Sequence, residues 1–154
     1  MPLLNYTTQV PASKTVSEIH TILAKHGATA ILTEYGPNHE VIAISFKVLT
    51  KHGELPFQLP CKPEAVYKIL RKRPRARYRV LAEQHDKEQA ERVAWRILKD
   101  WVEAQIAIIE TEMVTVEQVF LPYAVTPTGQ TLYEALAERQ FKALAGPSEI
   151  EGRR

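Results

Sequence analysis

The residues best suited to chemistry in this chain are basic, and they are concentrated in one short segment. Residues 68–79 read KILRKRPRARYR, with seven Lys and Arg residues among twelve and no acidic residue. The net charge of the whole chain is only +2, so the remaining residues together carry about −5. A local positive field of this kind is what binding to a polyanion requires. We call residues 68–79 the basic segment.

The basic segment combines cations with one aromatic ring. Lys and Arg contacts to phosphate give an affinity that falls with salt and depends little on base sequence, and an aromatic ring among arginines suits stacking on unpaired bases. The predicted nucleic-acid-binding residues are Lys68, Arg71, Lys72, Arg73, Arg75, Arg77, Tyr78 and Arg79. Lys47 or Arg96 could widen this surface. Two other interpretations stay open: a solvated loop that pairs with the acids following it, or a site for an acidic protein.

The other reactive side chains do not form a recognisable catalytic or metal-binding pattern. The histidines at positions 20, 26, 39, 52 and 85 lack the spacing of metal ligands. Cys61 is the sole cysteine and has no local His or Asp partner, so we interpret it as a small buried residue. A nuclease site of the αβββ type would need a carboxylate at position 45, where the chain has Ser45. We therefore expect a non-enzymatic protein without a cofactor or a metal site.

Length and composition predict one domain over residues 1–154. The chain is 45% hydrophobic and long enough to bury a core without disulfides. No apolar run approaches the 18 residues of a membrane span, and the N-terminus lacks the pattern of an export signal. We expect a cytoplasmic protein with no membrane partner. Within the domain we predict a strand-rich half over 1–60, a helical half over 61–146 and a disordered tail over 147–154.

The first half is predicted to form a β-α-β-β-β unit. Its strands are predicted over residues 3–10, 28–35, 41–49 and 55–59. Thr15 and Glu18 match a capping box, which predicts that a helix begins there and ends at Gly27. The strand over 41–49 places Ile42, Ile44, Phe46 and Val48 on one face. Pro56 cannot donate to a neighbouring strand, so the last strand is predicted to lie at a sheet edge.

The second half is predicted to be helical. Pro63 fits the first position of a helix that runs to about Arg73. Asp86, with Gln89 at the capping-box position, predicts the start of a long helix over 87–113. The apolar stripe of that helix is broad enough to be covered on more than one side.

Smaller signals complete the second half. Trp95 and Trp101 lie in the apolar stripe of the long helix, so core packing is preferred over a stacking platform. Thr115 and Thr131 are predicted N-caps of short helices near 116–121 and over 132–144. The predicted fold class is therefore α+β, a small and mainly antiparallel sheet packed with a C-terminal helical bundle.

Several stretches of the chain resemble an uncharacterised family of small bacterial proteins that is associated with phages and mobile elements. These stretches are MPLLNYTT, SKTVSEI, ERVAWRILKDWVEAQ and MVTVEQVFLPYAVTPTGQTLYE. The resemblance covers residues 1–60 and 86–135, and the basic segment lies between these two ranges. It implies no known activity, so no catalytic residue is carried over. It implies a setting in which proteins commonly handle DNA or block a host defence enzyme.

Two functions follow as hypotheses. The first is a non-enzymatic nucleic-acid-binding accessory protein of a phage or mobile element, which binds the phosphate backbone of DNA rather than RNA. The alternative is a protein-interaction module, an inhibitor or assembly subunit acting on a host or phage protein. It would use a sheet edge or the face with Val41, Ala43 and Leu49, which is apolar enough to suggest a covering partner.

Overall fold

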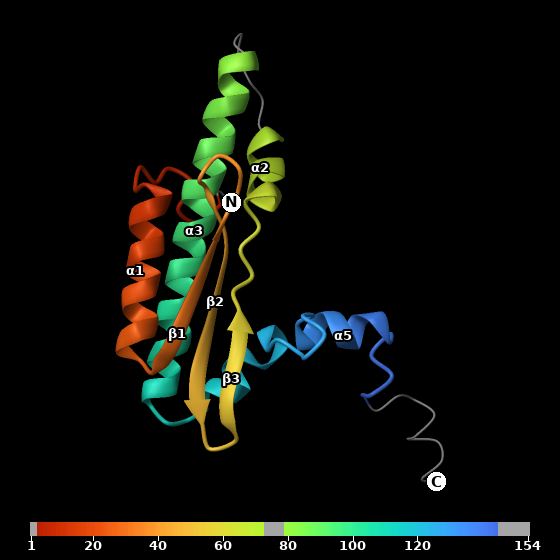
Figure 1. Ribbon diagram of the computed structural model, residues 1–154. Coiled ribbons are helices and arrows are strands. Elements are labelled where there is room, and N and C mark those ends of the chain that lie inside the picture. Colours follow the sequence, from red (N-terminus) through yellow and green to blue (C-terminus); the bar gives the residue numbers. More distant parts are fainter. Residues whose placement is uncertain (1–2, 73–78, 145–154) are drawn as a thin grey trace.

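The computed structural model describes residues 3–72 and 79–144, of which residues 79–84 are described by their backbone alone. The described residues form an α+β fold with five α-helices and a three-stranded sheet (Figure 1). The elements, in chain order, are α1 (Ala12–Lys25), β1 (Ala28–Tyr35), β2 (Val41–Thr50), β3 (Gly53–Gln58), α2 (Pro63–Arg71), α3 (Arg79–Glu110), α4 (Val116–Phe120), the 3-10 helix η1 (Leu121–Tyr123) and α5 (Leu132–Glu138).

The sheet is antiparallel throughout, with strand order β1-β2-β3. Phe46 at the centre of β2 pairs with Ile31 on β1 and with Phe57 on β3, which aligns three apolar side chains across one face. The prediction of three strands between residues 28 and 59 is confirmed. The edge position that Pro56 predicted for β3 is also confirmed, and the Pro56 carbonyl accepts a hydrogen bond from the Val125 amide outside the sheet at 2.9 Å.

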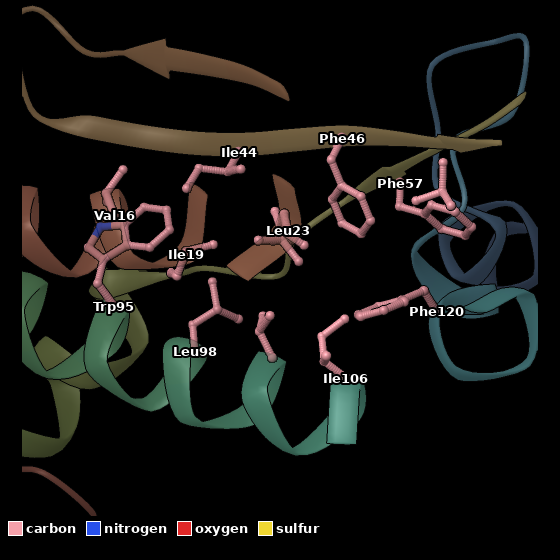
Figure 2. Packing of buried hydrophobic residues seen from close by; sticks show 13 residues of the cluster. Val16, Ile19, Leu23, Ile44, Phe46, Phe57, Trp95, Leu98, Ile106 and Phe120 are labelled. Carbon is pink, nitrogen blue, oxygen red and sulfur yellow. The ribbon is translucent and has the colours of Figure 1, made fainter. Parts of the chain in front are cut away.

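One face of the sheet is covered by α1 and α3, which lie side by side across it (Figure 1). The main core fills the space between these two layers. Its buried residues are Val16, Ile19, Leu23, Ile44, Phe46, Val48, Phe57, Leu59, Trp95, Leu98, Val102, Ile106 and Phe120. Figure 2 shows Trp95 beside Val16 at one end of this core and the rings of Phe46, Phe57 and Phe120 together at the other. Ile44, Phe46 and Val48 of β2 therefore pack in the core as predicted, whereas Ile42 on the same face is 51% exposed.

The strand predicted for residues 3–10 is wrong. These residues form successive turns, in which the Tyr6 amide bonds to the Leu3 carbonyl at 3.1 Å and the Thr8 amide to the Asn5 carbonyl at 3.0 Å. Gln89 on α3 then donates through Nε2 to the Tyr6 and Thr8 carbonyls, each at 3.0 Å. Side-chain bonds to α3 thus satisfy backbone groups that a strand would have paired in the sheet.

Two predicted helix starts are also wrong. α1 begins at Ala12, so Thr15 lies within the helix and is fully buried, while Glu18 hydrogen-bonds to Arg96 on α3. α3 begins at Arg79, so Asp86 is an interior residue of the helix rather than its N-cap. In both cases good helix-forming residues precede the capping pattern, and the helix extends through it.

The helix signals near the C-terminus are confirmed. Thr115 and Thr131 each form a complete capping box, with Gln118 and Glu134 respectively. α5 ends at Glu138, earlier than predicted, and Gln140 and Phe141 follow with positive φ angles. The predicted C-terminal bundle is not confirmed, because α5 packs against η1 and extends away from the other helices (Figure 1). The tail predicted over 147–154 lies outside the described residues.

The buried hydroxyl of Thr15 generates a stability prediction. Its Oγ1 atom is enclosed in the core and has no hydrogen-bond partner among the described residues. We expect Thr15→Val, which keeps the shape and removes the hydroxyl, to raise the free energy of unfolding by about 1 kcal/mol. Urea unfolding followed by circular dichroism measures the change.

The matched control is Thr21→Val on the same helix. Thr21 is exposed and its hydroxyl donates to the Ser17 carbonyl at 3.1 Å, so its replacement should change the free energy of unfolding by less than about 0.5 kcal/mol. A clear loss of stability in Thr15→Val would show that the Thr15 hydroxyl has a partner in solution.

Candidate nucleic-acid interface

The basic segment connects two helices that run in opposite directions. α2 leads away from the sheet, and α3 returns alongside it (Figure 1). Val66 and Leu70 of α2 pack against Ala90, Val93 and Ala94 of α3 in a second hydrophobic cluster, separate from the main core. This cluster holds the C-terminal end of α2 beside α3, at the end of the molecule where α3 extends past the sheet. We call this end the helical tip.

Three of the predicted binding residues are described with their side chains. Lys68 and Arg71 lie in the last turn of α2, Lys72 follows as its C-cap, and all three are exposed at the helical tip. Arg79 is the first residue of α3. The predictions for Arg73, Arg75, Arg77 and Tyr78 lie outside the described residues. The structure therefore places a cluster of three cations at one exposed end of the molecule.

Arg71 is held in place by Tyr67. Its Nη1 atom donates to the Tyr67 hydroxyl at 2.8 Å, and its guanidinium carbon lies 5.6 Å from the centre of the tyrosine ring. A cation near an aromatic face is attracted by the ring quadrupole. Arg71 is nevertheless exposed, so the contacts with Tyr67 orient a side chain at the surface.

Lys87 is a neighbouring cation that the sequence analysis missed. Its Nζ atom lies 6.0 Å from the centre of the Tyr67 ring, so Lys87 of α3 and Arg71 of α2 flank the same side chain. No local motif marks Lys87, because its position depends on how the two helices pair. The helical tip thus has one more cation at its base than the basic segment predicts.

The two residues considered as extensions of the basic surface lie elsewhere. Lys47 is on the opposite face of the sheet and pairs with Glu54 at 3.7 Å. Arg96 bonds to the Glu18 carboxylate, between α3 and α1. Both charges are matched by acids within the chain. Neither residue therefore extends the positive surface of the helical tip.

Part of the basic charge also has a structural role. The carbonyl groups at the C-terminal end of a helix carry partial negative charge, and cations there are favourable by about 0.3–1 kcal/mol each. Lys68 and Arg71 occupy this position in α2, and Glu64 occupies the complementary position in its first turn. This arrangement stabilises a helix of nine residues. Lys68 and Arg71 are also both exposed to solvent.

The tryptophans do not form a stacking surface. Trp95 is buried in the main core, as predicted. Trp101 is half-buried, and its ring meets Phe120 and Tyr123 edge-on at centroid distances of 5.6 and 5.5 Å. Both rings are therefore used in packing, and base stacking would have to come from another residue.

The remaining reactive groups are possible metal ligands and the Cys61 thiol. No group of three or more His, Cys, Asp and Glu side chains there is arranged to hold a metal ion. Burial raises the pKa of the Cys61 thiol to about 12, and the negative charges of Glu64 and Glu91 add to this rise. A protonated thiol is a poor nucleophile, which agrees with a packing role for Cys61.

Comparisons with known proteins were made at three levels. The chain matches no protein-family model, no curated protein and no solved structure. The resemblance to phage-associated proteins therefore stays an expectation from the sequence. In the part of the chain that the structure describes, no helix is long and apolar enough to cross a membrane.

Cys61 provides a test of the local electrostatics. Because its pKa is raised, the thiol should be almost fully protonated at pH 8, and its alkylation by iodoacetamide should be at least about a hundredfold slower in the folded chain than in urea. The rate in the folded chain should still be rising at pH 10, whereas the rate in urea should have levelled off. Equal rates, or the same pH dependence in both states, would contradict a raised pKa.

Proposed function

We propose that the protein is a non-enzymatic nucleic-acid-binding accessory protein that contacts the phosphate backbone through the basic segment. The observation that carries this proposal is the exposed cluster of Lys68, Arg71 and Lys72 at the helical tip, in a chain whose other residues are acidic on balance. A protruding cationic end attracts a polyanion, and the net negative charge of the other residues repels it. The resemblance to proteins of phages and mobile elements is the reason for expecting DNA.

The proposed contact is electrostatic. Each phosphate that a Lys or Arg neutralises releases bound counterions, so the logarithm of the affinity falls linearly with the logarithm of the salt concentration. The slope is about −0.7 per contact for a single strand and about −0.9 for a duplex. Little dependence on base sequence is expected, because the described residues at the helical tip offer charge rather than a set of base-reading side chains.

The first test is fluorescence anisotropy with labelled single- and double-stranded DNA at two salt concentrations. We expect binding at low salt that weakens as salt rises. Changing Arg75, Arg77 and Arg79 together to Ala should lower the affinity by about tenfold or more and make the salt slope shallower by about 2 to 3, because three phosphate contacts are removed. The same titrations with RNA test the preference for DNA.

The matched control removes three positive charges from other places. Lys14 and Lys25 on α1 and Lys51 in the turn between β2 and β3 are exposed, and changing them to Ala lowers the net charge equally. This control variant should bind DNA nearly as well as the wild type. No binding by the wild type at low salt, or equal losses in the two variants, would contradict a site in the basic segment.

A second candidate function, that of a protein-interaction module, is favoured by the outer face of the sheet. Leu32 and Leu49 point to this face and are 60% and 68% exposed, and no described element covers them. Along the described chain the free edge of β1 has no strand partner. A strand from another protein can extend such an edge, with apolar side chains adding specificity.

The two functions predict opposite results for two variants. If the outer face is the working surface, Leu32→Lys combined with Leu49→Lys should abolish capture of a partner by the tagged protein, and the triple-Ala variant should retain it. Because both leucines are exposed, the double variant should unfold at nearly the wild-type urea concentration. Retained capture by a folded double variant would exclude this face.

A further inference from the structure

A cavity of about 260 Å³ lies between the start of β2, α2 and α3. Part of its wall is apolar and is made by Val41, Ile42, Pro63 and Ala90. Ile42 points to the core side of β2 but is 51% exposed, because neither helix fully covers it. Ligand sites in proteins commonly combine an apolar wall with a few polar groups that orient the ligand.

The polar groups of the cavity are mainly carboxylates. Glu40, Glu64 and Glu91 line it, with Lys87 and Tyr67. Glu64 and Glu91 accept no hydrogen bond and form no ion pair with any residue that the structure describes. Lys87, the one ammonium group among the described lining residues, is directed to the Tyr67 ring. Three carboxylates and one ammonium group thus line the cavity, so its described lining carries a net negative charge.

The carboxylate of Glu40 is positioned by the turn that precedes β2. Its Oε2 atom accepts a hydrogen bond from the Asn38 amide at 2.8 Å, and the Gly36 amide donates to the Glu40 carbonyl at 2.8 Å. The side chain folds over Gly36, where a Cβ atom would lie 2.2 Å from Oε1. Only glycine leaves room for this placement. The orientation of Glu40 is thus built into the backbone of the turn.

The carboxylates also act on one another. The pKa of Glu91 is raised by burial, and the negative charges of Glu40 and Glu88 raise it further, against a smaller lowering by Arg92. Like charges that line one cavity favour an incoming cation. The apolar wall nearby favours a ligand with a hydrocarbon part.

We propose that this cavity binds a small organic cation, a primary ammonium or guanidinium group on a short aliphatic stem. The charged head would lie between Glu40 and Glu91, and the stem would lie against the wall formed by Val41 and Ala90. A bare metal ion fits less well, because no three acidic, His or Cys side chains among the described residues converge on one point. The carboxylates of the cavity are not part of the nucleic-acid site: Glu64 lies at the N-terminal end of α2 and the helical tip at its C-terminal end, and the two sites share Tyr67 and Lys87.

The chemistry allows two sources of the cation. It could be a free amine, or a lysine or arginine side chain presented by a peptide. Both would place the same head group between the same carboxylates. The experiment therefore uses n-butylammonium and n-butylguanidinium as free cations, blocked tripeptides with a central lysine or arginine, and n-butanol as the neutral control.

The readout is the chemical shifts of backbone amides in ¹H–¹⁵N NMR spectra of the full chain, at constant ionic strength. We expect the cations to shift amides around Glu40, Glu64 and Glu91 in a saturable manner, with a dissociation constant on the order of 0.1 to 1 mM for so small a ligand. Butanol should bind at least about tenfold more weakly, because it lacks the charge. Tighter binding of the free cations would assign a small amine, and tighter binding of the tripeptides a protein side chain.

Three variants locate the site. Glu91→Gln should weaken binding by about ten- to a hundredfold, because it removes one charge-assisted partner. Gly36→Ala should also weaken it, because the new Cβ atom displaces the Glu40 carboxylate. The matched control is Glu103→Gln on the same helix, about 18 Å further along, which removes the same charge and should bind as the wild type does.

Circular dichroism melting of each variant shows whether it is folded. If Gly36→Ala does not fold, Glu91→Gln serves as the deciding variant. The proposal is overturned if no cation shifts these amides, if butanol binds as tightly as butylammonium, or if Glu91→Gln and Glu103→Gln bind equally well.

Discussion

The packing of α3 across one face of a three-stranded sheet is the constraint on which the rest of the structure depends. A sheet of this size is stable only when an apolar face is covered, and α3 with α1 provides that cover. Along its length α3 contributes Trp95, Leu98, Val102 and Ile106 to the main core, and Ala90, Val93 and Ala94 to the cluster with α2. One helix therefore supports the sheet with one part and positions the helical tip with another.

α2 separates two oppositely charged features along a helix of nine residues. Glu64 in its first turn faces the cavity, and Lys68 and Arg71 in its last turn belong to the helical tip. This order of charges also agrees with the partial charges at the two helix ends. Tyr67 lies between the two features, since it lines the cavity and contacts Arg71. The proposed phosphate site and the proposed cation site thus lie at the two ends of one short helix.

Local signals in the sequence predicted much of the fold. The three strands between residues 28 and 59, the helix start at Pro63, the end of α1 near Gly27 and the capping boxes at Thr115 and Thr131 depend on neighbouring residues, and the structure confirms them. The errors come from contacts between distant residues. Gln89 holds residues 6–8 in turns rather than in a strand, and core packing buries Thr15 inside a helix that begins earlier.

The same distinction applies to the candidate sites. The cations of the basic segment lie close together in the chain, so they can be recognised in the sequence. In contrast, Lys87 near Tyr67, and the cavity between Glu40 and Glu91, depend on how a turn and two helices meet. Residues 40 and 91 are distant in the chain, and each alone has the pattern of an ordinary surface acid. Their relation could be found only in the folded structure.

The central claim is that the helical tip, and not the outer face of the sheet, meets nucleic acid. Its most direct test is an NMR titration of the ¹⁵N-labelled chain with a short DNA strand at low salt. The account predicts that amide shifts are concentrated at residues 68–72 and in the first turns of α3, that they fade as salt is added, and that the amides of Leu32 and Leu49 stay unchanged. Shifts centred on the outer face of the sheet, or none at all, would contradict it.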